Sequence, residues 1–219
     1  FFDRWCESQR WTDMIIAWVL LTLAVLLKIP TLYIGLPLLF VASTYGDGIL
    51  RALRSIRLWI FAAALVAATA LWYAHAHSLF LQTGNTFGIW TGSTNKWGDY
   101  DSLLTVKFYN DILFKSIAER HLTWPGMLLF IGGLFVRRAS RREWFAEWWM
   151  LAVLVYFLVV NKGNQVHEYY QLPFIPPAAI VIARMLEALR AHLPRLHVNA
   201  RRFATTMSIV MIAALLLLS

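Results

Sequence analysis

The sequence predicts an all-α protein, a polytopic bundle of transmembrane helices with about six or seven spans. Of the 219 residues, 59% are hydrophobic and only 15% are charged, and eleven are tryptophan, which is unlike an ordinary soluble domain. Apolar stretches of roughly 15 to 20 residues recur along the chain, and a helix needs about 20 such residues to cross a bilayer. Charged residues bound these stretches, as expected for spans that end at the membrane surface.

Several segments fit this pattern, and some of them are short. We predict spans at 13–27, 31–46, 57–74, 122–136, 144–160, 171–186 and 203–218. The first two and 122–136 would cross only with interfacial residues or a thin local bilayer. We expect the first two to form a tight helical hairpin that turns at Lys28-Ile29-Pro30. The alternative is one long helix kinked at Pro30.

The domain organisation is expected to be simple. We find no internal repeat and no low-complexity linker, so the sequence predicts a single transmembrane domain over residues 1–219. The chain begins at Phe1 with no signal peptide and ends within LLLLS, which predicts a fragment of a longer protein. Its one cysteine, Cys6, allows no internal disulfide.

Basic residues predict the orientation, because short loops rich in Lys and Arg stay on the cytoplasmic side. Twelve arginines lie in 51–57, 137–142 and 184–202. Alternating the spans puts all three segments inside and sends 75–121 and 161–170 outside. Arginines that face anionic headgroups and enforce this topology would explain the net charge of +8 without a nucleic-acid partner.

Ionisable groups gather at the predicted outer surface. Lys28 lies at the hairpin turn, and the cluster His167-Glu168-Tyr169-Tyr170 directly precedes the span 171–186. A charge at the membrane edge is costly unless it reaches water or meets a partner. A lysine, an imidazole and two phenols near a helix start suit a phosphate at headgroup depth.

We therefore predict that Lys28, His167, Tyr169 and Tyr170 bind a phosphate and its lipid, and that Lys28 approaches His167 and Tyr169 in the fold. The alternative for each residue is an interfacial anchor, a common role of Tyr and Lys. Prolines 173, 176 and 177 fall in the first turns of the span 171–186, where missing backbone donors cost little. They are expected to start that helix rigidly, as Pro30 does after Lys28.

The outer segment 75–121 divides in two. Residues 81–101 are rich in Gly, Asn, Thr and Trp, so Trp90 and Trp97 are candidates to stack on sugar faces. Asp99 or Asp101 are candidates to bind hydroxyl groups of a sugar or acceptor. The alternative is an ordinary interfacial loop with aromatic anchors.

Residues 102–121 are predicted to form an interfacial helix that lies on the membrane. Two sets of side chains separate on it. The apolar set is Leu104, Phe108, Leu113 and Ile117, and the charged set, at i,i+4 spacing, is Lys107, Asp111 and Lys115.

Other chemistries have little support. His75 and His77 are two residues apart, which points them to different faces of a helix, and no HExxH or paired CxxC motif accompanies them. No glycine-rich phosphate loop of the GxxxxGK type is present. We expect no metal, no cofactor and no nucleic acid.

Two segments resemble a known family. The run HEYYQLPFIPPAAIVIA, residues 167–183, resembles the histidine-tyrosine-leucine-proline segment near the end of the membrane domain of bacterial glycosyltransferase family 39 proteins. The run LAVLLKIPTLYIGLPLLF, residues 23–40, is similar to that family's lysine-proline segment. Relatives include protein O-mannosyltransferases and aminoarabinose transferases. Glu168 separates His167 from Tyr169, whereas the family more commonly has the histidine and the tyrosine adjacent.

The resemblance implies an integral membrane transferase of GT-C architecture in the bacterial inner (plasma) membrane. Such an enzyme takes a sugar from a polyprenyl-phosphate donor on the outer face and passes it to a glycan, lipid or protein acceptor of the cell envelope. By position, Lys28, His167 and Tyr169 match donor-phosphate and lipid contacts. The family's catalytic carboxylate lies in a first outer loop that precedes this segment, so the resemblance implies no catalytic residue here.

Two other classes share these features. A transporter or flippase for lipid-linked substrates would also hold charges at a membrane edge, but transporters commonly carry repeats and mid-membrane polar sites, which the sequence lacks. A ligase or polymerase acting on polyprenyl-linked glycans would share the site chemistry.

Overall fold

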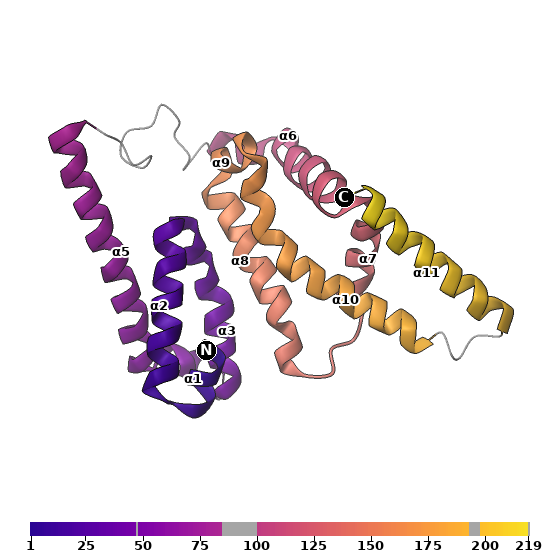
Figure 1. Cartoon of the computed structure of the whole chain (residues 1–219), viewed down its shortest axis with the longest axis horizontal. Helices are drawn as coiled ribbons and strands as arrows, with labels where there is room; N and C mark the ends of the chain where they lie inside the picture. Colours follow the sequence, from indigo (N-terminus) through magenta and orange to yellow (C-terminus); the bar gives the residue numbers. More distant parts are fainter. Residues whose placement is uncertain (47, 85–99, 193–197, 219) are drawn as a thin grey trace. The chain divides into compact units, whose positions relative to one another are not determined.

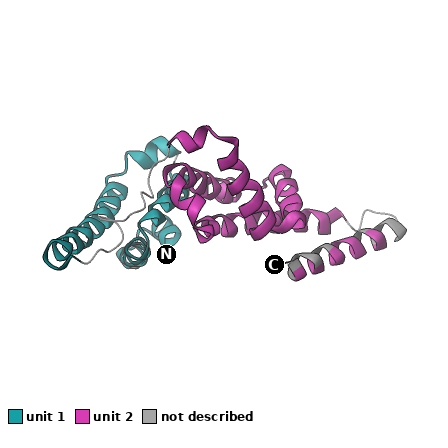
Figure 2. Ribbon diagram, turned by 90° about the horizontal axis from the view of Figure 1, so that it is seen from above, with its two compact units in different colours: residues 1–95 teal, residues 96–219 magenta. Residues whose placement is uncertain are grey.

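The computed structural model describes residues 1–46, 48–84, 100–192 and 198–218, which form helices and no strand (Figure 1). The all-α prediction is confirmed for these residues. The chain divides into two compact units, residues 1–95 and 96–219 (Figure 2).

The first unit is built on a broken helical pair. Its elements are α1 (Phe2–Ser8), α2 (Trp11–Leu27), η1 (Ile29–Ile34), α3 (Gly35–Tyr45), α4 (Ile49–Leu53) and α5 (Ile56–Thr83). The helix α2 ends because Lys28 has an extended backbone, with φ −156° and ψ 106°. Pro30 then stands at the start of the 3₁₀ turn η1, where it needs no backbone donor.

The contacts of α1 show that α2 and α3 form a hairpin. At the start of α2, Asp13 pairs with Arg4 of α1 at 3.0 Å. At the end of α3, the Tyr45 hydroxyl donates to Oδ1 of Asp3, again on α1, at 2.8 Å. The start of α2 and the end of α3 therefore both lie next to α1, so the chain turns back between them (Figure 1). The predicted hairpin is confirmed, and the single kinked helix is excluded.

Aromatic rings close the core of this unit. Trp5 stacks on Phe61 of α5 with centroids 5.2 Å apart, and Phe2 meets both rings edge-on at 5.4 Å. The helix α5 continues to Thr83, past the predicted end of its span at Ala74. Residues 75–83 are therefore helical, and the predicted outer loop is shorter than expected. With 28 residues, α5 is about 42 Å long and exceeds the thickness of a bilayer core.

The second unit carries the remaining helices. They are η2 (Tyr100–Leu104), α6 (Val106–Tyr109), η3 (Asn110–His121), α7 (Thr123–Phe135), η4 (Arg141–Trp144), α8 (Phe145–Val159), α9 (Asn161–Val166), η5 (Glu168–Phe174), α10 (Ile175–His192) and α11 (Val198–Leu218). The long helix α10 packs on α7 and α8. Each segment predicted as a span is helical over its described residues, apart from the end residues Gly46, Leu122, Val136 and Val160.

Length separates these helices into two groups. Two stretches in the described residues, Ile56–Thr83 and Glu168–His192, are long and apolar enough to cross a membrane. The apolar helices Trp11–Leu27, Ile29–Tyr45 and Thr123–Phe135 are shorter. Membrane association therefore has support from two helices, and a bundle of six or seven spans stays a prediction.

The helix predicted over 102–121 is present but has a different buried face. Its α-helical part begins at Val106, and residues 110–121 form a π-helix. Because π-turns are wider, the buried positions follow steps of four and five residues, and Phe108, Ile112 and Ile117 point inward. The predicted apolar face was wrong for Leu104, which is 87% exposed, and for Leu113.

The charged side of this helix is confirmed as an ion-pair chain. Asp111 accepts from Lys107 at 2.6 Å and from Lys115 at 2.8 Å. These hydrogen bonds lower the pKa of Asp111 to about 2. The carboxylate therefore stays ionised at any physiological pH, and its position relative to a membrane stays a prediction.

Two neighbouring glycines of α7 give a sharp test of the packing against α10. A Cβ on Gly133 would overlap the Val181 carbonyl and lie 2.8 Å from Val181 Cγ1, whereas a Cβ on Gly132 would meet only the flexible Met185 side chain, at 3.1 Å. We expect Gly133→Ala to destabilise the fold by about 1–3 kcal/mol through overpacking. We expect Gly132→Ala to be near neutral, because alanine also favours the helix. Thermal unfolding in detergent measures both, and equal melting temperatures would contradict this helix contact.

The predicted topology has its own test. Single cysteines at 54 and 140, in the arginine-rich segments, should resist an impermeant thiol reagent added from outside, and a cysteine at 95 should react. The native thiol is first removed as Cys6→Ser. The expectation follows from the excess of Lys and Arg in cytoplasmic loops. Labelling of position 140 from outside would overturn the arrangement.

Candidate functional site

The His-Tyr segment forms a cluster of three rings between α8 and α10. His167 has an extended backbone, with φ −122° and ψ 109°, and separates α9 from the 3₁₀ turn η5. Its ring centroid lies 5.3 Å from that of Tyr169 and 5.2 Å from that of Tyr170, and the two tyrosine rings meet edge-on at 4.9 Å. The structure therefore brings three of the four predicted phosphate ligands together.

The two tyrosines differ in exposure. Tyr170 is buried, and a Cβ on Gly163 would lie 2.8 Å from its ring, so this tyrosine packs against a residue that must be glycine. Tyr169 is 52% exposed, and His167 is half-buried. Tyr170 therefore supports the cluster, whereas Tyr169 and, in part, His167 reach the surface.

A positive charge reaches the same segment from the π-helix. Arg120, near the end of η3, forms an ion pair with Glu168, which lies between His167 and Tyr169. Both side chains are more than half exposed, so the pair contributes little to stability. The adjacent His121 is part-buried, and burial, followed by the charge of Arg120, lowers its pKa. His121 is therefore neutral at physiological pH. Sequence reasoning missed both residues, which lie some 50 positions upstream in a segment identified by its amphipathic pattern alone.

Buried amides line the inner side of the cluster. The Gln171 amide donates to the Asn164 carbonyl oxygen, and the Asn164 amide donates to the carbonyl of Val160 at 2.9 Å. Within the described residues, the side-chain oxygens Asn164 Oδ1 and Gln171 Oε1 are buried and accept no hydrogen bond. Such acceptors are costly unless a donor reaches them. Both oxygens lie inside the protein, away from solvent, and the sequence pattern NKGNQ gave no signal of them.

The other predicted site residues lie elsewhere. Lys28 is half-buried at the break between α2 and η1, in the first unit, so its approach to His167 and Tyr169 stays a prediction. Trp97 and Asp99, like Trp90, lie outside the described residues. In the described part of the chain, no three His, Cys, Asp or Glu side chains gather as metal ligands.

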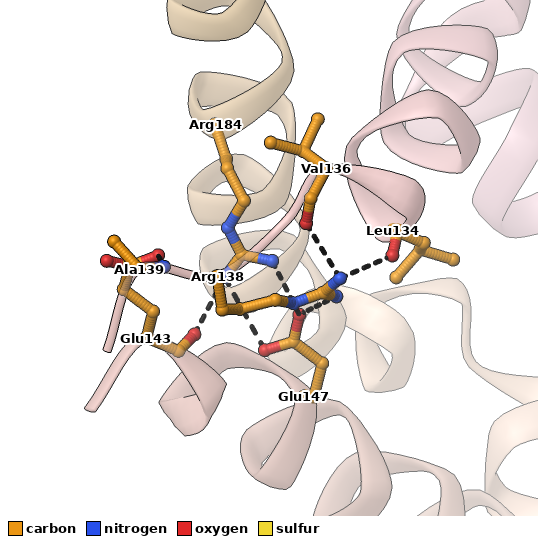
Figure 3. Close-up of polar contacts among 7 residues, drawn as sticks. All are labelled: Leu134, Val136, Arg138, Ala139, Glu143, Glu147 and Arg184. Carbon is orange, nitrogen blue, oxygen red and sulfur yellow. Dashed lines mark hydrogen bonds and ion pairs between the residues drawn. The ribbon is translucent and has the colours of Figure 1, made fainter. Parts of the chain in front are cut away.

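A second polar cluster joins α7, α8 and α10 on the predicted cytoplasmic side (Figure 3). Glu147, in the first turn of α8, accepts from Arg138 and from Arg184 through the same oxygen, with Arg184 Nη1 at 2.6 Å. The side chains of all three are at most 16% exposed. Arg138 and Arg184 were expected to face lipid headgroups, and the structure corrects this, because they pair with the part-buried carboxylate of Glu147 instead.

Backbone carbonyls complete this cluster. Arg138 donates to the carbonyls of Leu134 and Val136 at 2.7 and 2.8 Å, and Arg184 donates to the carbonyl of Glu143 at 2.7 Å (Figure 3). The Arg138 guanidinium also lies 4.5 Å from the Trp144 ring centroid. Since both arginines have several acceptors, the cluster holds helices together, and the His-Tyr cluster is the better candidate for binding.

No protein family model matches the chain, and no curated protein or solved structure matches it. The described residues form a helical chain, and two of their helices are long and apolar enough to cross a membrane.

Proposed function

We propose that this chain is part of an integral membrane glycosyltransferase that moves a sugar from a polyprenyl-phosphate donor to an acceptor on the outer face of the membrane. The observation that carries the proposal is the ring cluster of His167, Tyr169 and Tyr170 with its partly exposed imidazole and phenol. The resemblance of residues 167–183 and 23–40 to glycosyltransferase family 39 supports it. The two helices long enough to cross a membrane agree with a lipid-linked substrate.

The groups present fit the donor's chemistry. Cleaving a sugar from a lipid phosphate develops negative charge on the leaving phosphate, and fixed hydrogen-bond donors aimed at that charge lower the barrier. The Tyr169 hydroxyl and the His167 imidazole are such donors, and Arg120 adds a cation at the same segment. The general base that activates the acceptor belongs, in this proposal, to the part of the enzyme that precedes residue 1.

The test is sugar transfer from a polyprenyl-phosphate donor by the full-length protein in detergent, normalised to folded enzyme. We expect His167→Ala to lower the rate about tenfold to a hundredfold, the value of one hydrogen bond to a charged group. The matched control is His75→Ala, an exposed histidine of α5 that lies outside the cluster. Equal activity of the two variants would contradict a role for His167.

The same assay separates the transferase from the other classes. A transferase releases polyprenyl phosphate as the sugar leaves, whereas a transporter or flippase returns the donor intact. A polymerase or ligase releases a polyprenyl carrier but extends or attaches a glycan chain. Intact donor after incubation with every acceptor class would therefore favour transport.

A further inference from the structure

An ion pair joins the π-helix to the His-Tyr cluster. Arg120, near the end of η3, pairs with Glu168, the first residue of η5, and these two elements pack together. Glu168 stands between His167 and Tyr169 in the chain, and the ring centroids of those two residues are 5.3 Å apart. The carboxylate and its arginine therefore belong to the segment at which the phosphate is proposed to bind.

This pair is easily broken. The side chains of Arg120 and Glu168 are 52% and 68% exposed. An exposed ion pair contributes little to stability, because water and salt screen it. The ion pairs of Glu147, by contrast, join side chains that are at most 16% exposed. A ligand can therefore reach Arg120 and exchange places with the carboxylate of Glu168 at little cost to the fold.

The partner of Arg120 is an anion of the protein itself. A carboxylate and a phosphate both offer oxygens that match the planar fork of a guanidinium, so Glu168 and a bound phosphate compete for the same donors. Glu119 precedes Arg120 and Lys162 precedes the His-Tyr segment, and their charges have opposite signs. Glu168 is therefore the carboxylate that a phosphate meets at Arg120.

Sugar transfer changes the charge of the phosphate. In the donor, the phosphate links the polyprenyl chain to the sugar, so it is a diester with a single negative charge. When the sugar leaves, the bond between its anomeric carbon and the phosphate oxygen breaks, the electron pair stays on that oxygen, and the proton of the acceptor hydroxyl passes to the general base. The product is a phosphate monoester, with about 1.5 to 2 negative charges at pH 7. A neighbouring carboxylate repels this product more strongly than it repels the donor.

We propose that Arg120 and Glu168 select the charge of the bound phosphate: Arg120 binds it, and Glu168 favours the singly charged diester of the donor over the doubly charged monoester of the product. This inference rests on the proposed function and adds a specificity-determining carboxylate to it. By repelling the product, Glu168 speeds release of the spent carrier, a step that limits the turnover of many enzymes.

The experiment compares two ligands that share a chain and differ by one charge. Polyprenyl phosphate is the monoester and its methyl ester is the diester, and the binding of each to the purified full-length protein in detergent is measured at about pH 8, where the monoester is a dianion. We expect Glu168→Gln to tighten the monoester about threefold to fivefold more than the methyl ester, the value of one exposed charge pair. In the transfer assay, polyprenyl phosphate should inhibit this variant more strongly than the wild-type protein.

Variants of the arginine test the other half of the pair. Arg120→Gln should weaken both ligands about tenfold, because each loses a hydrogen bond between charged groups. Arg120→Lys keeps the charge without the planar fork and should recover part of this loss. The matched controls are Glu187→Gln and Arg190→Gln, which break another mostly exposed ion pair and should leave both affinities unchanged. All of these variants should keep the wild-type melting temperature, since exposed pairs add little stability.

Three results would overturn the inference. Equal tightening of the two ligands in Glu168→Gln would remove the selection by charge, and unchanged affinities in Arg120→Gln would leave the pair a surface contact only. In both cases, binding of the polyprenyl ligands by the wild-type protein would still support the proposed function. If the wild-type protein binds neither ligand, the proposed function fails, and this inference fails with it.

Discussion

Glu147→Ala is expected to destabilise the folded chain by about 1.5–3 kcal/mol, because it leaves two part-buried guanidinium groups without their counter-charge. Glu147 is the shared partner of Arg138 and Arg184, and guanidinium groups do not deprotonate in proteins. The backbone carbonyls of Leu134, Val136 and Glu143 still accept from the arginines, which places the loss toward the lower end. Thermal or denaturant unfolding in detergent measures it.

The matched control is Glu187→Ala. Glu187 pairs with Arg190 at 2.8 Å on the same helix, but both side chains are more than 60% exposed. Exposed pairs contribute little, so this variant should leave the melting temperature nearly unchanged. Comparable losses in the two variants would show that the Glu147 cluster is not the anchor between α8 and α10 that its geometry indicates.

The positions of the helices could be predicted from the sequence because a helix is a local structure. Apolar runs marked the seven predicted spans, and Lys28-Ile29-Pro30 marked the turn of the hairpin. The short helices α1, α4 and α9 had no such run and were not predicted. The end of α5 was misplaced because hydropathy falls after Ala74 while helix propensity does not. The helix instead stops at Gly84, whose φ of 71° is the left-handed conformation of a glycine C-cap.

The contacts between helices could not be predicted in the same way. Glu147 and Arg184 are 37 residues apart, and their pairing depends on the rotation of α8 and α10 about their axes, which a run of apolar residues does not specify. Arg138 and Arg184 were assigned to basic segments of the sequence. The number of arginines in a segment does not show which of them pack inside the protein and which lie at its surface. The π-helical register of 110–121 likewise has no signal in an i,i+4 pattern.

The site was predicted in part, for the same reason. His167, Tyr169 and Tyr170 are adjacent in sequence, so a local turn is enough to bring their rings together. Arg120 and Asn164 join them from other elements and could be found only from the fold. Lys28 belongs to the other unit, so its predicted role as a phosphate ligand is tested by an activity measurement.

Lys28→Ala is expected to lower sugar transfer by the full-length protein about 10²–10³-fold, the range for losing one preorganised electrostatic contact. In the proposed mechanism, the lysine faces a phosphate whose negative charge grows as the sugar departs. The structure places Lys28 where α2 ends in an extended residue and η1 begins, so a short turn holds its backbone. Specific activity with a polyprenyl-phosphate donor, normalised to folded enzyme, is the measurement.

Lys28→Arg separates a phosphate ligand from a membrane anchor. An arginine keeps the charge, but its planar fork does not replace a compact ammonium in a tight turn, so it should recover only part of the activity. An anchor behaves differently, because either cation can snorkel to the interface and the substitutions then lower expression or stability alone. Lys107→Ala, at an exposed lysine of the helix that follows α5, is the matched control and should retain activity. Near-normal specific activity in Lys28→Ala would assign Lys28 to the anchors and remove it from the donor site.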